Sequence, residues 1–254
     1  MTVLRALWKI LRGLWHLLVG LWTIYLRFPR MSLEQREMQV QAWALQLLAL
    51  WGIHLKVIGQ PVRSGPALIV SNHISWLDIL VIHAARFCRF VSKSDIRSWP
   101  IVGPLATGAG TLYIERSSRR DALRMVRDMA DAMKEGDVVA VFPEGTTSDG
   151  RELLPFHANL IQSAIAAEVP VQPMSLCFVD TRSGEMTLAP CYIGDDTLVG
   201  SVWRTFVGAL IVQVVRIGMT FMGVSVFAQQ IVFGFILVAA VAVTMDRTKV
   251  LVIK

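Results

Sequence analysis

Cysteine is scarce in this chain, which has only three among its 254 residues, at Cys88, Cys177 and Cys191. Their odd number and wide spacing argue against a disulfide framework, and they lack the paired spacing of a zinc site. We therefore expect a reducing compartment and no bound metal.

Charged residues are also few, because Asp, Glu, Lys and Arg together make up 17% of the chain, whereas 54% of the residues are hydrophobic. This balance is more apolar than that of an ordinary soluble domain. Basic residues outnumber acidic ones, which results in a formal net charge of +6. The excess favours an anionic partner, and the apolar chain ends favour a membrane surface over nucleic acid.

The N-terminal segment, residues 1–52, is expected to form two membrane-anchoring helices joined as a hairpin. The uncharged run Gly13–Leu26 has 14 residues, fewer than the roughly 20 that span a bilayer. Its Trp and Leu residues alternate with cations, which is typical of an amphipathic helix lying in the membrane interface. A signal peptide is the alternative, although no small-residue cleavage site follows. Ser32, with Gln35 three residues later, predicts a capping box for a second helix that ends near Trp51.

Residues 53–218 are predicted to form an α/β domain with a central mixed sheet flanked by helices. Strand-like apolar runs alternate there with helical periodicity, as in sheets covered by helices. The expected strands are His54–Gly59, Ala67–Ser71, Phe87–Ser92, Thr111–Ile114, Asp137–Phe142, Val171–Cys177 and Met186–Tyr192. The expected helices are Asp78–Arg86, one that starts at Ser118 and stops at Gly136, Phe156–Ala167, and 201–216.

Residues 219–254 form a hydrophobic tail whose role the sequence leaves open. The run Ile217–Met245 contains no charged residue and is long enough to cross a bilayer. Three interpretations remain: a C-terminal membrane helix, a buried segment, or foreign sequence joined to the domain.

The turn after the strand expected at 67–71 contains a histidine and an aspartate five positions apart, His73 and Asp78. In a continuous helix, five steps of roughly 100° would put them on different faces. They can meet only if His73 lies in the turn and Asp78 in the first turn of the following helix. The pattern therefore predicts a contact between a base and the carboxylate that orients it.

Further chemistry-bearing blocks follow other expected strands. They are Gly110–Arg116, Phe142–Thr146, Val169–Pro173, and Lys93 with Pro100 and Gly103. Together with Asn72, His73 and Asp78, these blocks resemble the NHxxxxD and FPEGT motifs of the 1-acylglycerol-3-phosphate acyltransferases. The resemblance covers about residues 50–200 and implies the glycerolipid acyltransferase fold.

The resemblance implies transfer of a fatty acyl group from acyl-CoA or acyl carrier protein to the free hydroxyl of 1-acylglycerol-3-phosphate, giving phosphatidic acid. It implies His73 as the general base and Asp78 as the group that orients it, with no cofactor beyond the thioester co-substrate. The residues implied to bind the phosphate-glycerol part of the acceptor are Lys93, Arg116, Glu144, Gly145 and Thr146. Structural residues expected at the site are Asn72, Ser75 and Pro143. The expected location is the cytoplasmic face of the inner membrane.

Two departures from the family pattern affect the acceptor headgroup. Thr147 stands where family members often have Arg, and His157 where many have Lys, with Arg151 a candidate substitute cation. Another lyso-lipid, such as lyso-ornithine lipid, therefore stays open as acceptor. Two alternatives come from other classes: a non-catalytic membrane-binding protein, and a lipid hydrolase using Ser75, which lacks the G-x-S-x-G elbow of such enzymes.

Overall fold

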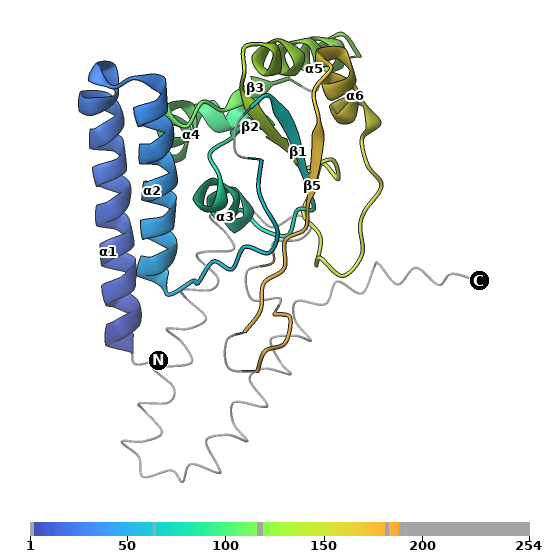
Figure 1. Ribbon diagram of the computed structural model, residues 1–254. Helices are drawn as coiled ribbons and strands as arrows, with labels where there is room; N and C mark the ends of the chain where they lie inside the picture. Colours follow the sequence, from blue (N-terminus) through green and yellow to red (C-terminus); the bar gives the residue numbers. More distant parts are fainter. Residues whose placement is uncertain (1–2, 63–64, 116–118, 181–182, 188–190, 192–254) are drawn as a thin grey trace. The chain divides into compact units, whose positions relative to one another are not determined.

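The computed structural model describes residues 3–62, 65–115, 119–180, 183–187 and 191 (Figure 1). The chain divides into two compact units, Met1–Asp195 and Asp196–Lys254. The second unit lies wholly outside the described residues, and with it the helix expected at 201–216 and the apolar tail. Every helix and strand of the described residues belongs to the first unit.

Five parallel strands form the central sheet, in the order β3-β2-β4-β1-β5. They are β1 (Ala67–Ser71), β2 (Arg89–Lys93), β3 (Leu112–Ile114), β4 (Val138–Val141) and β5 (Val171–Met174). Every pairing between these strands is parallel, so the expected mixed sheet is wrong for the described part of the chain. Helical crossovers separate consecutive strands and return the chain to the same edge, which makes neighbouring strands parallel.

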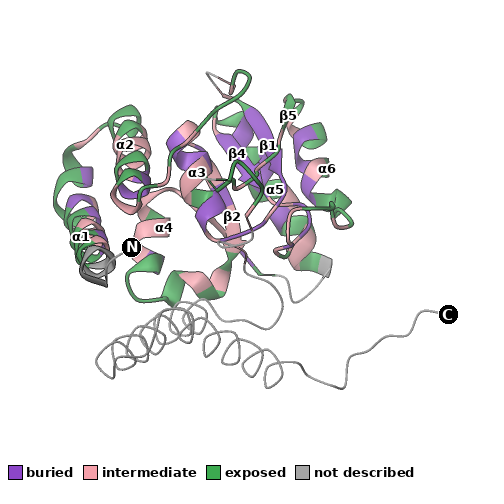
Figure 2. Ribbon diagram, turned by 90° about the horizontal axis from the view of Figure 1, so that it is seen from below, coloured by how far each residue is buried: buried purple, intermediate pink, exposed green. Residues whose placement is uncertain are grey.

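The two central strands, β1 and β4, are buried along their whole length (Figure 2). The covering helices are α3 (Leu77–Ala85), α5 (Arg119–Lys134) and α6 (Ala158–Ala167). Leu68 packs in one core cluster with Met129 of α5 and Leu160 of α6. Ile69 packs in another cluster with Ile82 of α3. Burying one such side chain stabilises the fold by about 1.5–3 kcal/mol, which explains why both strands are continuous apolar runs.

The segment expected as a strand at His54–Gly59 is not a strand. Val57 is 48% exposed and Ile58 86%, whereas Leu55 is partly buried against the core cluster of α2 and α3. The chain here is an irregular link toward β1, tied to the sheet where the Val62 amide donates to Gln172 Oε1 over 2.9 Å. Strand propensity was overridden because this segment pairs with none of the described strands.

The strand expected at Met186–Tyr192 is described only in part. Met186 forms an isolated antiparallel bridge with Val179, while residues 188–190 and 192 lie outside the described residues. The other five expected strands are present, with their ends shifted by up to three residues.

The N-terminal segment is a helical hairpin, as predicted. Its helices are α1 (Val3–Trp22), a π-helical turn Thr23–Arg27, a 3₁₀ turn Phe28–Arg30, and α2 (Leu33–Trp51). Both hydrogen bonds of the capping box are present: the Gln35 amide donates to Ser32 Oγ and the Ser32 amide donates to Gln35 Oε1. Two N–H groups at the start of α2 are thereby satisfied.

Two glycines of α1 allow α2 to approach closely. A Cβ atom at Gly20 would lie 2.7 Å from Nε1 of Trp43, and one at Gly13 would lie 2.8 Å from Nε1 of Trp51. The Trp43 indole also donates to the carbonyl of His16 over 3.1 Å. The two indoles therefore fill the space that a side chain larger than that of glycine would need at positions 13 and 20.

The hairpin rests on the α/β domain through α3 and through α4 (Val102–Gly108). A Cβ at Gly20 would lie 3.1 Å from Leu105 of α4, and one at Gly108 would lie 2.5 Å from Ile24. On the other side, Ala44 and Leu48 of α2 pack in a core cluster with α3. The hairpin is therefore part of the folded unit.

The outer face of α1 has large exposed apolar side chains. Trp8 is 61% exposed, Trp15 68%, Leu18 53% and Trp22 55%. None of the described helices combines the length and the apolar character needed to span a membrane.

Candidate active site

Because its strands are parallel, the sheet has all their carboxyl ends along one edge. Loop residues that follow different strands can meet at this carboxyl edge. The turn with Asn72 and His73 follows β1, and the FPEGT loop from Phe142 follows the adjacent strand β4. Lys93 ends β2, which pairs with the other side of β4. The turn with His73, the FPEGT loop and Lys93 therefore gather at this carboxyl edge, whereas Val169 and Pro170 precede β5 at its other end.

His73 and Asp78 form the predicted contact across the turn, with Nδ1 2.8 Å from Oδ2. The imidazole is 19% exposed, whereas Asp78 is completely buried in the first turn of α3. Because Asp78 accepts from Nδ1, the tautomer with a free lone pair on Nε2 is favoured. Among the described residues, no side chain hydrogen-bonds that second nitrogen. The geometry suits a general base that faces an acceptor hydroxyl.

The position of the Asp78 carboxylate is fixed by the turn itself. Its Oδ2 also accepts the amides of Ile74, over 2.6 Å, and Ser75, over 2.9 Å. Three donors therefore converge on one oxygen at the N-terminus of a helix, where negative charge is favoured. The other oxygen, Oδ1, is buried without a hydrogen-bond partner among the described residues.

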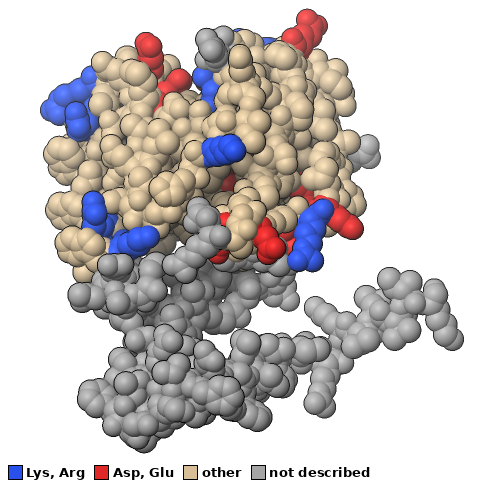
Figure 3. All heavy atoms as spheres, turned by 60° about the horizontal axis from the view of Figure 1, so that its bottom comes forward, with Lys and Arg blue, Asp and Glu red and all other residues tan. Residues whose placement is uncertain are grey.

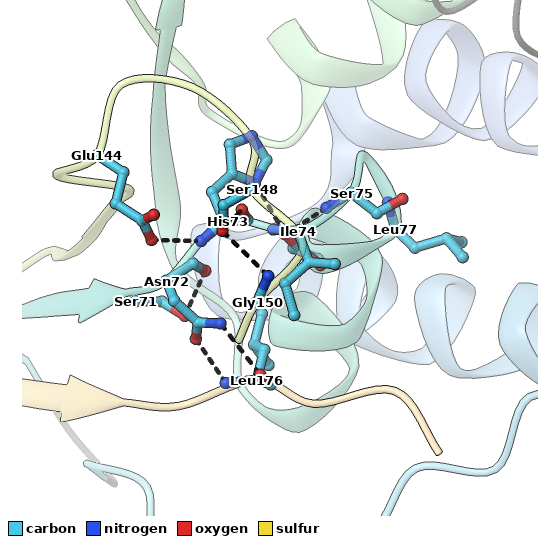
Figure 4. Close-up of polar contacts among 11 residues, drawn as sticks. Ser71, Asn72, His73, Ile74, Ser75, Leu77, Glu144, Ser148, Gly150 and Leu176 are labelled. Carbon is cyan, nitrogen blue, oxygen red and sulfur yellow. Dashed lines mark hydrogen bonds and ion pairs between the residues drawn. The ribbon is translucent and has the colours of Figure 1, made fainter. Parts of the chain in front are cut away.

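The backbone of His73 is held by the FPEGT loop (Figure 4). Its amide donates to Glu144 Oε1 over 3.0 Å, and its carbonyl accepts from the Ser148 amide over 2.8 Å. The second oxygen of Glu144 accepts the Leu154 amide over 3.2 Å, and the side chain is only 4% exposed. In this structure Glu144 braces two loops, and its predicted acceptor-binding role stays a prediction.

The residues expected to be structural lie inside the turn. The side-chain amide of Asn72 makes two hydrogen bonds with the backbone of Leu176. Its Nδ2 donates to the Leu176 carbonyl over 3.1 Å, and its Oδ1 accepts from the Leu176 amide over 2.7 Å. These bonds join the end of β1 to the chain after β5. Ser75 is completely buried, and its hydroxyl accepts the Leu77 amide over 3.3 Å. Pro143 is fully buried at the base of the FPEGT loop. This hydroxyl has no exposed surface and is engaged in the helix turn, so it is not presented to a substrate as a hydrolase nucleophile would be.

The residues expected to bind phosphate are distributed around the edge. Lys93 and Thr146 are exposed, and Gly145 has a φ of +68°, a conformation that favours glycine. Arg116 lies outside the described residues. Arg151, the candidate substitute cation, is 68% exposed, and its Nε lies 3.9 Å from Oδ2 of Asp149. Their roles in binding stay predictions.

Sequence reasoning missed the aromatic residue that stacks on the imidazole. The ring of Phe142 lies parallel to His73, with centroids 4.0 Å apart and an interplanar angle of 10°. The two residues are distant in sequence, so no local spacing signalled this contact. The hydrogen bond from the Ser148 amide to the His73 carbonyl was missed for the same reason.

Two of the three cysteines lie where burial disfavours the reactive thiolate form. Burial raises the pKa of the Cys88 thiol and keeps it protonated. Desolvation also raises the pKa of Cys191, with smaller contributions from Asp149 and Asp78. No three His, Cys, Asp or Glu side chains in the described part of the chain are grouped so as to hold a metal ion.

Comparison with known proteins identifies the family. Residues 54–177 match the Acyltransferase family. The 1-acyl-sn-glycerol-3-phosphate acyltransferase of Neisseria meningitidis serogroup B is 39% identical over 173 residues, which are 67% of this chain and 67% of that protein. The chain belongs to this acyltransferase family. The predicted family and the acyl-transfer class of the enzyme are therefore confirmed.

Two further matches are a relative with a different named acceptor and a solved structure. The lyso-ornithine lipid O-acyltransferase of Pseudomonas aeruginosa is 36% identical over 173 residues, covering 68% of this chain and 66% of that protein. The crystal structure of the 1-acyl-sn-glycerophosphate acyltransferase PlsC from Thermotoga maritima superposes with a TM-score of 0.53 at 21% identity. It covers 67% of this chain and 72% of that one, which supports the shared fold.

Proposed function

We propose that this acyltransferase moves a fatty acyl group from acyl-CoA or acyl carrier protein to the free hydroxyl of 1-acylglycerol-3-phosphate. The product is phosphatidic acid, a precursor for phospholipid synthesis. The observation that carries the proposal is the 2.8 Å contact between His73 Nδ1 and Asp78 Oδ2 in a chain of this family. An alcohol is a weak nucleophile at neutral pH, and an oriented imidazole is suited to removing its proton.

The proposed reaction proceeds without an acyl-enzyme. Nε2 of His73 takes the proton of the acceptor hydroxyl as its oxygen bonds to the thioester carbonyl carbon. The carbon–sulfur bond then breaks, and the imidazolium returns the proton to the departing thiolate. Asp78 stabilises the transient imidazolium and is not itself protonated. The only co-substrate is the thioester, and no cofactor is required.

Acceptor binding is proposed at the carboxyl edge beside His73. Lys93 and Arg116 would supply positive charge for the phosphate, while Gly145 and Thr146 would supply loop N–H and hydroxyl groups. Glu144 would act there by holding the loop in place, since both of its oxygens are engaged by backbone amides.

The hairpin is proposed to bind the membrane in which the acceptor resides. The exposed apolar side chains on α1 suit the interface between headgroups and acyl chains. Figure 3 shows a surface that is mostly uncharged, with Lys and Arg in scattered groups. Anionic lipid would attract the net charge of +6. We place the enzyme at the cytoplasmic face of the inner membrane, where a thioester donor is available.

A second candidate acceptor is lyso-ornithine lipid. It is favoured by the 36% identity to the Pseudomonas aeruginosa enzyme and by Thr147 and His157, which leave fewer cations for a phosphate than the family pattern. Such an acceptor also presents a free hydroxyl, so the same chemistry at His73 would serve it.

The test is acyl transfer by the purified full-length protein in phospholipid vesicles. Labelled acyl-CoA is offered with lysophosphatidic acid, lyso-ornithine lipid or lysophosphatidylethanolamine, and products are separated by chromatography. We expect phosphatidic acid as the main product and a loss of at least about 10²-fold in His73→Ala. The matched control is His54→Ala, because His54 is exposed in the link before β1.

Each result discriminates between hypotheses. Preference for lyso-ornithine lipid would replace the first candidate by the second. Full activity of His73→Ala would overturn the proposed base. A covalent adduct with a serine-reactive probe, together with release of free fatty acid, would support the hydrolase instead.

A further inference from the structure

Three aromatic side chains form a column against one face of the His73 imidazole. Phe142 lies parallel to that ring, with centroids 4.0 Å apart and an angle of 10°. Phe90 stacks on Phe142 at 5.6 Å and 19°. The ring of His83 meets Phe90 in a T-shaped contact at 5.0 Å and 77°. The proposed reaction assigns no role to any of the three.

One end of the column lies on α3, and the other end lies against His73, whose imidazole contacts the Asp78 carboxylate of the same helix. His83 lies on this helix five positions after Asp78. The helix therefore contacts His73 twice: directly through the Asp78 carboxylate, and indirectly through His83, Phe90 and Phe142. Phe90 is 3% exposed and His83 is 5% exposed, so the far end of the column is embedded in the core. Phe90 also pairs with Ala140 of β4, the strand that leads into Phe142.

The hydrogen bond to Asp78 leaves one rotation of the imidazole ring unrestrained. It fixes the position of Nδ1, but the ring plane can still rotate about that contact, and the direction of Nε2 changes with the plane. A parallel aromatic face 4.0 Å away restrains the plane, because tilting would break the stacking contact. Together the two contacts define where Nε2 points.

The same contact also favours the charge that forms during the reaction. When Nε2 accepts a proton, the imidazolium lies over the face of Phe142, and a cation is attracted to an aromatic face. The attraction is greater for the charged ring than for the neutral one, so it acts mainly on the transition state. A residue of this kind changes kcat more than the KM for the acceptor.

The base of the column carries no competing charge. Burial lowers the pKa of His83 to about 4, and its Nδ1 has no hydrogen-bond partner among the described residues. The side chain is therefore neutral at physiological pH and supports Phe90 by ring contact.

We propose that Phe142 is a positioning residue that sets the plane of the His73 imidazole, with Phe90 supporting it from the core. The proposal rests on the proposed acyl transfer for its kinetic readout only. The Phe of the FPEGT block would thus act through His73 without contacting substrate.

The first test compares kinetics of the full-length enzyme in vesicles. We expect Phe142→Leu to lower kcat by about tenfold while the KM for lysophosphatidic acid changes by less than about twofold. Phe142→Tyr keeps the aromatic face and should retain at least about half of kcat. The matched control is Phe87→Leu, because Phe87 contacts the column only through His83, at 5.8 Å, and kcat should stay within about twofold.

Denaturation curves of the same variants separate positioning from simple destabilisation. Phe90 is more deeply buried than Phe142, so Phe90→Leu should lose the most stability. Positioning predicts that Phe142→Leu, in direct contact with His73, loses the most kcat. Losses of kcat that follow the order of the stability losses would overturn the proposal.

The second test needs no turnover. In protein with ¹⁵N-labelled histidine, the low-field Nδ1 proton of His73 is assigned by its disappearance in His73→Ala. We expect it to broaden or vanish in Phe142→Leu and to persist in Phe142→Tyr and Phe87→Leu. An unchanged signal in Phe142→Leu would overturn the positioning role, whereas failure of the wild type to acylate any acceptor would overturn the proposed function alone.

Discussion

His73 and His83 lie ten residues apart in the sequence and have opposite surroundings. His73 lies in the turn at the carboxyl edge, where it is partly exposed and contacts a carboxylate at 2.8 Å. His83 lies within α3, where its ring contacts are Phe87 and Phe90. The first environment favours a charged imidazole during turnover, and the second opposes charge at all times. The place of each histidine, in the turn before α3 or within the buried helix itself, therefore determines whether it can act as a base.

The comparison also shows how each ring is oriented. A polar contact defines the tautomer of His73, and apolar contacts hold the plane of both rings. The two histidines are therefore parts of one arrangement, and substitutions around each ring should separate their contributions.

Removing the charge of Asp78 should have the largest effect. Asp78→Asn preserves the size of the side chain but removes the negative charge that stabilises the imidazolium of His73, and it places an amide group where Oδ1 is buried without a partner among the described residues. By analogy with other oriented histidines, we expect kcat to fall by about 10²–10⁴-fold.

Steady-state kinetics with lysophosphatidic acid would measure this loss, with circular dichroism as the check on folding. A kcat within threefold of wild type would show that the negative charge is dispensable. His73 would then need only the ring contacts that hold its plane, as His83 does.

The buried histidine should instead govern the pH dependence of stability. Burial holds the pKa of His83 at about 4, below the ordinary value of 6.5. Between these two values the unfolded chain binds a proton that the folded chain excludes. Stability from this source is therefore complete above about pH 6.5 and falls as the pH is lowered toward 4, with a loss of about 2 kcal/mol by pH 5.

The variant His83→Phe isolates this effect. Urea denaturation at pH 7 and pH 5 should show a smaller difference between the two conditions in the variant than in the wild type. An equal difference in both proteins would mean that His83 is not excluded from protonation by the fold. Activity at pH 7 should be retained, because Phe can preserve the ring contact with Phe90.

Local features of the sequence predicted local structure well. The capping box of Ser32 and Gln35 and the contact of His73 with Asp78 each involve residues at most five positions apart, where spacing constrains geometry. The segment His54–Gly59 was misread because propensity carries no information about whether a partner will bury it.

Contacts between distant segments could not be predicted in the same way. The stacking of Phe142 on His73 and the brace from Glu144 depend on β1 and β4 being neighbours, which follows from the sheet order. The parallel direction of every described strand pair is likewise a property of the crossovers, and single strands do not signal it.

The smallest effect is expected at Ser75, between the two histidines. Its buried hydroxyl accepts the Leu77 amide over 3.3 Å, so Ser75→Ala should cost about 0.5–1.5 kcal/mol of stability by removing that hydrogen bond. The Ser75 amide, which donates to Asp78, remains in the variant, and kcat should be nearly unchanged. Thermal denaturation and acyl-transfer kinetics on one preparation would test both statements. A large loss of kcat without loss of stability would restore Ser75 as a nucleophile and turn the His73–Asp78 pair into part of a hydrolase triad.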